Sequence, residues 1–266
     1  MTQKPTKRSH TVQKGYLKFF STKPEEENPR VMVFDKKRGN TYTNSVENIT
    51  VENNFYKIPL EFVEGFVESF PEYEDFFTTD FVEKFFNINF ETPYLKVIKE
   101  FFSSNYPTGS LLEHSPFKVV VSAYIAIQYM RTRNIRTTME GTFSSFQIEK
   151  EYHPLLHFIY LLNDSEKLKS VSTSIYERLW TVYVNETSVP FKTSDNPVVI
   201  TEGNELVFPI SSKHLIYIKN EKFNDFNIMK DLKLESLLDP NKVNYFNYLQ
   251  EQQCDSQVIW EGDGTL

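Results

Sequence analysis

Polar residues that interrupt apolar or extended stretches are the first candidates for chemistry in this sequence. Gln128 and Arg131 lie three positions apart at the end of the apolar run FKVVVSAYIAIQYM, so a helix would present both on one face. The Arg131 guanidinium could hold a phosphate or carboxylate through two parallel hydrogen bonds. Alternatively, it could bind a core carboxylate, such as Asp195 or Glu91, and only stabilise the fold.

Asp195 and Asn196 lie in the stretch TSDNPV, between two extended pieces and immediately before Pro197. Aspartate and asparagine bond their own backbone in turns, and the residue before a proline is driven to extended geometry, so a turn explains the pattern. An aspartate at the end of a strand could also serve as a metal ligand or a general base. We therefore treat Asp195 and Asn196 as candidate catalytic residues, together with Gln128 and Arg131.

Glu83 and Glu91 lie eight positions apart, about 80° around a helix if that helix is continuous. Two such carboxylates could line one cleft, where they would suit divalent-metal binding or acid–base catalysis. The segment contains many other acids, so a solvated acidic face is the alternative. We name Glu83, Glu91 and Asp195 as candidate metal ligands and a divalent metal as the candidate cofactor.

Histidine supplies the remaining candidates. His10 is followed by Lys14 and Lys18, one and two turns further along a helix, and could assist phosphoryl chemistry; a basic surface turn is the alternative. His153 and His157 have the spacing of a zinc pair but lack the glutamate of H-E-x-x-H, so we expect structural roles. The sequence contains no Walker loop, G-x-G-x-x-G or G-x-S-x-G, which leaves nucleotide-fold and serine-hydrolase classes without support.

The elements that must position these residues alternate between β and helical patterns. Strand-like runs on both sides of KKRGN predict an N-terminal β-hairpin at about 31–46. Apolar residues at helical spacing predict a helical subregion at about 59–165, and short β-like runs predict a C-terminal antiparallel β-meander at about 177–218. The predicted fold is α+β, with one domain over 1–266.

Three helices in the middle of the chain bear on the candidate residues. Thr79-Asp80 should cap one helix, and Thr92-Pro93 should begin another, with proline in its first turn. The run that follows Pro116 contains no helix-breaking residue before Gly141. It therefore predicts one long, buried central helix over about 116–140.

Composition limits the function classes. The 266 residues include 24 Phe and 15 Tyr, enough for a substantial core. A net charge of −7 disfavours a broad basic face for nucleic acid but allows a local basic cleft. The single cysteine, Cys254, excludes an internal disulfide and fits a reducing compartment. Because the chain lacks a long apolar run and a signal-like N-terminus, we expect a cytoplasmic protein without a membrane partner.

Five segments, in this order and spacing, resemble the bacterial family called domain of unknown function 4238. The family pattern opens with two histidines and a proline; here Ser9 replaces the first histidine and Gln13 replaces the proline. The most specific segment is TSDNPV at 193–198. The other segments are VMVFDK at 31–36, ENITVENNFY at 47–56 and IAIQYMRT at 125–132.

The resemblance implies a biological setting more than a reaction, because the family has no settled biochemistry and its members occur as single-gene antiphage defence systems. If the family uses a histidine pair, Ser9 implies an impaired copy. One hypothesis is a bacterial or phage-encoded defence effector, a nuclease-like hydrolase acting on nucleic acid by metal-assisted phosphodiester chemistry. The other is a non-catalytic defence or scaffold protein that binds a phage or host protein.

The catalytic hypothesis makes a geometric demand. His10, Gln128, Arg131 and Asp195 should converge in one pocket, with the glutamates nearby. Asp195 and a glutamate would hold the metal, Arg131 the phosphate, and His10 would act as acid or base. Purely structural roles would leave at least two of these groups on unrelated surfaces.

Overall fold

The structure of the chain is a computed structural model that describes residues 8–110, 116–163, 165–222, 224 and 231–262. Helical segments are α1 (Lys14–Leu17), α2 (Leu60–Ser69), α3 (Phe81–Phe86), α4 (Thr92–Ser103), α5 (Phe117–Met130), α6 (Arg133–Ser145), α7 (His153–Asn163), α8 (Ser165–Tyr176) and α9 (Pro240–Gln253), with shorter turns η1 (Lys18–Phe20), η2 (Val46–Asn48), η3 (Pro71–Tyr73), η4 (Asn87–Glu91) and η5 (Lys150–Tyr152). Strands are β1 (Arg8–His10), β2 (Arg30–Asp35), β3 (Asn40–Ser45), β4 (Val51–Asn53), β5 (Arg178–Asn185), β6 (Thr193–Ser194), β7 (Val199–Ile200), β8 (Leu206–Pro209), β9 (His214–Lys222), β10 (Lys233–Leu237) and β11 (Gln257–Trp260).

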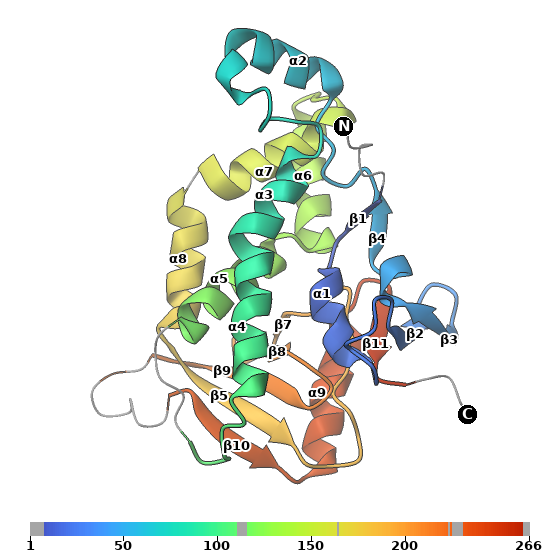
Figure 1. Cartoon of the computed structure of the whole chain (residues 1–266), viewed down its shortest axis with the longest axis vertical. Helices are drawn as coiled ribbons and strands as arrows, with labels where there is room; N and C mark the ends of the chain where they lie inside the picture. Colours follow the sequence, from blue (N-terminus) through green and yellow to red (C-terminus); the bar gives the residue numbers. More distant parts are fainter. Residues whose placement is uncertain (1–7, 111–115, 164, 223, 225–230, 263–266) are drawn as a thin grey trace.

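The predicted α+β class is confirmed. Figure 1 shows a helical part above and the larger sheets below, with α3 and α4 running down between them. A small sheet pairs β1 with β4, and a larger one has the order β3-β2-β11-β6. Another sheet has the order β10-β5-β9-β8-β7. Helices and strands are therefore largely segregated, as the order of the sequence patterns predicted.

The predicted N-terminal hairpin is present as β2 and β3. In its turn, the Asp35 carboxylate accepts hydrogen bonds from the backbone N–H groups of Lys37 and Arg38, and Gly39 adopts a positive φ of 66°. On its other side β2 pairs with β11, and β11 pairs with β6 of the TSDNPV segment. The hairpin is thus one edge of a sheet completed by strands from the far end of the sequence.

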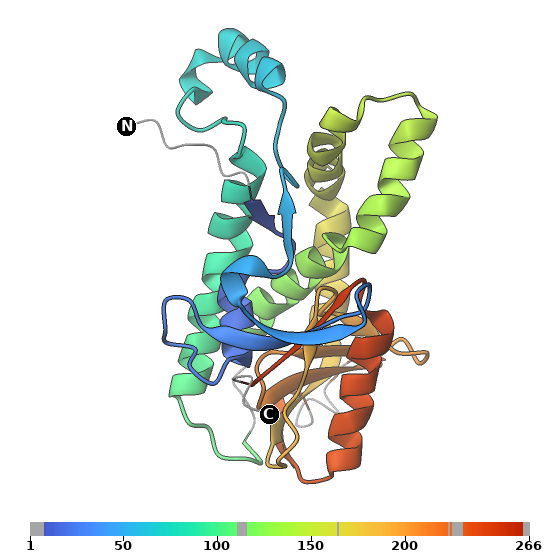
Figure 2. The same ribbon diagram turned by 90° about the vertical axis from the view of Figure 1, so that its right-hand side faces the viewer.

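The C-terminal meander is present with one addition. β7, β8 and β9 pair in succession as antiparallel neighbours, and β9 pairs with β5 in the same sense. β10 lies outside the predicted β region and adds a parallel edge strand beside β5. Figure 2 shows α9 packed along the strands of this lower part.

The long central helix predicted over about 116–140 is wrong in length. α5 ends at Met130, Thr132 adopts extended geometry, and α6 begins at Arg133. His157 of α7 stabilises the break, because its Nε2 lies 3.2 Å from the Met130 carbonyl oxygen. A continuous helix would pair that carbonyl with the amide of residue 134. α6 also runs past Gly141, the predicted end, to Ser145.

The two helices predicted from Asp80 and Thr92 form nearly one helix. A single π-helical turn, η4, joins α3 to α4. Pro93 lacks a backbone N–H and would leave an α-helical hydrogen bond unmade, and a π turn absorbs such an irregularity. This continuity matters because Glu83 and Glu91 lie along it.

The main hydrophobic core joins the helices to the sheets. Tyr94 and Tyr124 stack with ring centroids 3.7 Å apart, and both lie near the ring of Phe208 in β8. The Tyr16 hydroxyl bonds Thr193 and the carbonyl of Pro209, which fixes α1 to both larger sheets. α5 is buried along most of its length, yet within the described residues no helix is long and apolar enough to cross a bilayer.

The break between α5 and α6 generates a prediction about pH. Burial lowers the pKa of His157 to about 4 from its usual 6.5. The unfolded chain therefore takes up a proton near pH 6.5, whereas the folded protein resists protonation until about pH 4. His157 should thus make the free energy of unfolding fall by about 3 kcal/mol as the pH drops through this window.

Urea denaturation of the wild type and His157→Gln across this pH range measures the effect. The variant keeps an N–H donor for the Met130 carbonyl but cannot titrate. We expect it to be less stable at neutral pH and to approach or pass the wild type in acid. His214, whose pKa burial also lowers to about 4, is present in both proteins and cancels in the difference. Parallel stability–pH profiles would contradict the assignment.

Candidate active site

A cavity of about 500 Å³, called here the His10 cleft, lies between the N-terminal segment and the long helix of α3, η4 and α4. Figures 1 and 2 both place α1 and β1 alongside this helix. The approach is close, because a Cβ at Gly15 would overlap the Leu95 side chain. The charged or titratable residues that line the cleft are His10, Lys14, Lys18, Asp80, Glu83, Lys84, Glu91 and Arg131.

Arg131 lies at the buried base of this cleft, with 2% of its surface exposed. Its Nε donates to the Tyr56 hydroxyl (2.8 Å), Nη1 to Glu91 Oε1 (2.7 Å) and Nη2 to the His10 carbonyl oxygen (3.4 Å). Burial acts to lower the pKa of Arg131, but Tyr56 and Glu91 outweigh it and hold the pKa above its usual value. Because every nitrogen is paired within the protein, the geometry favours the alternative in which Arg131 binds the core carboxylate Glu91.

Gln128 binds the same backbone segment as Arg131. Its Nε2 donates to the carbonyl oxygen of Thr11 at 3.1 Å, while Arg131 bonds the preceding carbonyl, that of His10. Two side chains on one face of α5 thus hold two consecutive peptide groups at the end of β1. Both are positioning residues for His10.

His10 is the titratable side chain that these contacts position. Its Nε2 is buried and has no hydrogen-bond partner among the residues that the structure describes, while the ring bonds the backbone of Val46. Burial lowers the pKa of His10, so the neutral ring with a free lone pair is favoured. A neutral imidazole of this kind can accept a proton from a reacting group.

Glu83 lines the same cleft and is bonded to Ser9, the residue before His10. The Ser9 hydroxyl donates to Glu83 Oε2 at 2.8 Å. Burial raises the pKa of Glu83 against this hydrogen bond, and the charge of Glu91 raises it further. Ser9, which stands where the family pattern has a histidine, therefore connects the His10 segment to a carboxyl group that holds its proton more tightly than usual.

Lysines lie along the rim of the cleft. Lys14 forms an ion pair with Glu47, and Lys84 lies 3.0 Å from Asp80. Lys18 donates to the carbonyl oxygens of Glu26 and Glu27. Half-exposed ammonium groups of this kind could reach toward an anion without the rearrangement that freeing Arg131 would require.

Asp195 does not line the His10 cleft. It lines a different cavity, with Arg133 and Asp255. Its carboxylate accepts hydrogen bonds from the backbone N–H groups of Asp255 (2.9 Å), Ser256 (2.7 Å) and Gln257 (3.1 Å), and from the Ser256 hydroxyl (2.7 Å). Its pKa is nevertheless raised by burial. These hydrogen bonds hold the turn that leads into β11, which is a structural role; we call this group of contacts the Asp195 clasp.

Asn196 belongs to the same clasp. Its Nδ2 donates to the carbonyl oxygen of Gln253, and Ser194 bonds Gln250, both near the end of α9. The predicted convergence therefore holds for His10 and Arg131, with Gln128 attached through Thr11, while Asp195 and Asn196 belong to a separate network.

The predicted metal-ligand set does not come together either. Glu83 and Glu91 line the His10 cleft, whereas Asp195 lines another cavity, and its carboxylate oxygens accept hydrogen bonds from backbone N–H groups. In the part of the chain that the structure describes, no three histidine, cysteine or acidic side chains form a metal-binding group. These residues do not fit the three-ligand site expected from the sequence.

Sequence reasoning missed Ser9 and Tyr56 as parts of the site. The sequence does contain a signal for Tyr56, because this residue ends the segment at 47–56 that carries part of the family resemblance. Ser9 departs from the family pattern, and its bond to Glu83 spans seventy-four positions, so no local pattern indicates it. The zinc-like pair His153 and His157 has the structural role expected, each ring bonding a backbone carbonyl.

The fold and the site together define an α+β protein with a histidine–glutamate cleft built on a buried arginine. The chain belongs to the family described as protein of unknown function (DUF4238), whose family model matches residues 8–263. The resemblance seen in five segments is thereby confirmed over nearly the whole chain. Neither the curated proteins nor the solved structures that were compared with the chain gave a match.

Removing the Arg131 guanidinium should be strongly destabilising. Arg131→Met strands Glu91 and the Tyr56 hydroxyl without their partner, and we expect a loss of about 3–5 kcal/mol in the free energy of unfolding. Arg133→Met is the matched control. Within the part of the chain that the structure describes, the ion pairs of this exposed arginine are surface pairs with Asp255 and Glu52, so the substitution should cost less than about 1 kcal/mol. Equal losses in denaturant unfolding would refute a special role for Arg131.

Asp195→Asn tests the clasp. The amide cannot accept all of the hydrogen bonds that the carboxylate accepts, and its NH₂ group would oppose backbone N–H donors, so we expect a loss of about 2–3 kcal/mol. Asp255→Asn, which alters only exposed ion pairs, should cost less than about 1 kcal/mol. A stable Asp195→Asn protein that had lost divalent-metal binding would instead restore the metal-ligand interpretation.

Proposed function

We propose that this protein is an effector enzyme of antiphage defence that cleaves phosphodiester bonds of nucleic acid in the His10 cleft by acid–base catalysis. The observation that carries the proposal is that His10 and Glu83 line the same cleft. The unpartnered Nε2 and lowered pKa of His10 suit a base, and the raised pKa of Glu83 suits an acid. The defence setting rests on the family alone, whose description states no activity.

The chemistry assigns one task to each group. A substrate that displaces the side chains covering the His10 Nε2 gives that nitrogen the proton of an attacking hydroxyl group, whose oxygen bonds to phosphorus as the bond to the leaving oxygen breaks. The Glu83 carboxyl group gives its proton to that leaving oxygen. Lys14, Lys18 and Lys84 on the rim offset the negative charge that develops on the phosphoryl oxygens. Arg131 acts indirectly, by fixing the His10 backbone.

Metal assistance, expected from the sequence, is not part of this proposal. Of the three predicted ligands only Glu83 and Glu91 line the cleft; Glu91 is already engaged by Arg131, and the further carboxylate there, Asp80, is paired with Lys84. A divalent ion would therefore compete with the ion pair that holds the base of the cleft. Acid–base chemistry uses the groups as they are arranged.

A non-catalytic role remains the second candidate, and one surface favours it. Large apolar side chains are exposed on and beside α2 and η3, which project from the top of the molecule in Figure 2. They include Leu60, Phe70, Tyr73 and Phe76, of which 58%, 47%, 46% and 57% is exposed. Exposed apolar side chains, most of them aromatic and gathered in one short segment, are typical of surfaces that meet a protein partner.

The deciding experiment incubates the purified protein with labelled RNA and DNA oligonucleotides, in EDTA and in magnesium. We expect cleavage in EDTA that His10→Gln and Glu83→Gln each reduce at least about a hundredfold. Glu72→Gln, an exposed glutamate of η3, is the control and should retain full activity. Thermal unfolding of every variant verifies that it is folded.

The outcomes separate the two candidates. Cleavage by folded wild type that both substitutions abolish supports the catalytic proposal. Absence of cleavage under all conditions, with phage protection unchanged by His10→Gln but lost in Phe70→Ser/Phe76→Ser, supports the partner-binding protein. Cleavage that needs magnesium and survives His10→Gln would overturn the acid–base assignment.

The pH dependence provides an independent check. The base must be neutral, which requires a pH above the lowered pKa of His10, and the acid must be protonated, which requires a pH below the raised pKa of Glu83. We therefore expect a bell-shaped profile whose acid limb lies below the ordinary histidine pKa of 6.5 and whose alkaline limb lies above the ordinary glutamate pKa of 4.5. In Glu83→Gln the alkaline limb should disappear from the residual activity.

A further inference from the structure

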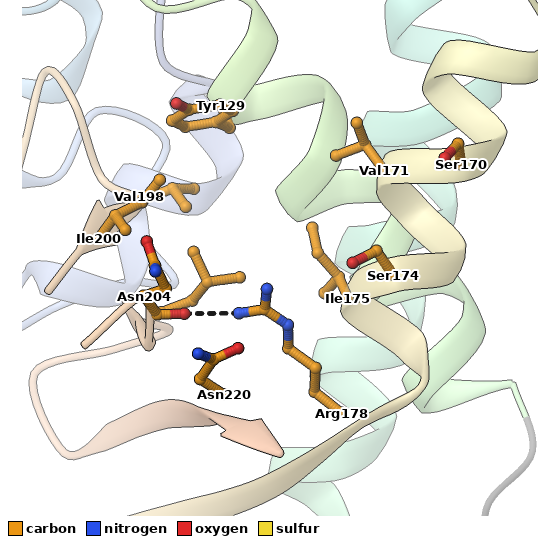
Figure 3. Close-up of a pocket in the computed structure, with 11 residues that line it drawn as sticks. Tyr129, Ser170, Val171, Ser174, Ile175, Arg178, Val198, Ile200, Asn204 and Asn220 are labelled. Carbon is orange, nitrogen blue, oxygen red and sulfur yellow. Dashed lines mark hydrogen bonds between the residues drawn. The ribbon is translucent and has the colours of Figure 1, made fainter. Parts of the chain in front are cut away.

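A second cavity, called here the Arg178 pocket, lies between α8 and the strands β7, β8 and β9. It has a volume of about 420 Å³ and shares no lining residue with the His10 cleft. Figure 3 shows its side chains converging from the helix on one side and from the strands and their turn on the other. A cavity of this size can hold a small organic molecule.

The interior of the Arg178 pocket is apolar. Ile175 of α8, Val198 and Leu206 are buried and form its inner surface. Val171 and Ile200 extend the apolar wall toward the rim. The walls therefore favour a ligand with a hydrocarbon or aromatic body, because enclosing it removes apolar surface from water on both partners.

One cation faces this apolar space. Arg178 is the single charged residue among those that line the pocket, so no carboxylate of the lining neutralises it. Its Nη1 donates to the carbonyl oxygen of Asn204 at 2.6 Å, as the dashed line in Figure 3 marks. Among the described residues, Arg178 has no ion-pair partner. The guanidinium is thus oriented by one bond, while its charge is left for a ligand.

The free edge of this guanidinium indicates the chemistry of the ligand. With Nη1 engaged by Asn204, the Nε–H and Nη2–H groups remain as two parallel donors. That spacing matches the two oxygens of a carboxylate. The hydroxyl group of Ser174 and the amide of Asn220 lie nearby on the rim and can donate further hydrogen bonds.

We propose that the Arg178 pocket is a binding site for a small carboxylate with an apolar body, such as an aryl or short acyl acid. The apolar inner surface takes the body, and the Nε–Nη2 edge of Arg178 takes the carboxylate. A nucleoside polyphosphate is excluded, because its several charges would meet one cation and an apolar floor. The site is independent of the function proposed for the His10 cleft.

Binding of three probes to the whole protein tests the proposal. Phenylbutyrate and octanoate supply the predicted chemistry, and phenylbutanol is the neutral match of the first. Saturation-transfer NMR and calorimetric titration should detect both acids with affinities in the millimolar range or tighter. Phenylbutanol should bind at least about tenfold more weakly, because it lacks the charged contact.

Variants assign the binding to this pocket. Arg178→Met removes the cation at similar length and should weaken both acids at least about tenfold while leaving phenylbutanol unchanged. Ser174→Phe fills the cavity from an exposed helix position and should abolish binding of all three probes, even if the arginine variant fails to fold. Lys169→Met, on the same helix but outside the pocket, is the control and should bind like the wild type.

The results that overturn the proposal are equally definite. Failure of both acids to bind the wild type overturns it, as does equal binding by the wild type and Ser174→Phe. Equal affinity for phenylbutyrate and phenylbutanol would show that Arg178 does not recognise the carboxylate. Loss of binding in Lys169→Met would place the interaction on the charged surface of α8 and not in the cavity.

Discussion

The helical part of the molecule depends on the burial of one guanidinium group. A buried cation is costly unless its donors are paired, and Arg131 obtains its partners from three segments: Tyr56, Glu91 and the backbone of His10. Each segment must therefore be brought to the end of α5. The break between α5 and α6 lies directly after this residue, so the same point fixes the helix geometry and the base of the His10 cleft.

The family segments divide between two separate networks. The first joins His10, Tyr56, Gln128 and Arg131, and it orients an imidazole beside a cavity. The second centres on Asp195, and it fastens α9 and β11 to the body of the protein. A distinctive motif can thus reflect structural necessity as much as chemistry. The more specific motif, TSDNPV, turned out to be the structural one.

The sequence predicted what local patterns determine. The hairpin around Gly39 and the apolar character of α5 follow from turn chemistry and periodicity, and both are present. The sequence did not predict the end of α5, because the contact that stabilises it is distant: the His157 ring bonds the Met130 carbonyl. The bond from Arg131 to Glu91 was one of the alternatives left open, because a buried arginine must find a carboxylate. Which carboxylate it finds, and the isolation of Asp195, depend on packing that no spacing rule encodes.

The pairing of β11 with β2 has a consequence for the order of folding. Gln257 of β11 lies opposite Asp35 of β2, and the Gln257 side chain accepts a hydrogen bond from the backbone N–H of Thr50. The carbonyl oxygen of Thr50 in turn accepts a hydrogen bond from the backbone N–H of Thr11, the residue after His10. Contacts between such distant residues form late, because a large loop must close, at a cost in chain entropy, before the contacts can stabilise the fold. The segment that carries His10 is therefore held from two sides, by α5 and by a strand from the far end of the sequence. The complete geometry around the imidazole forms only when β11 has joined the sheet.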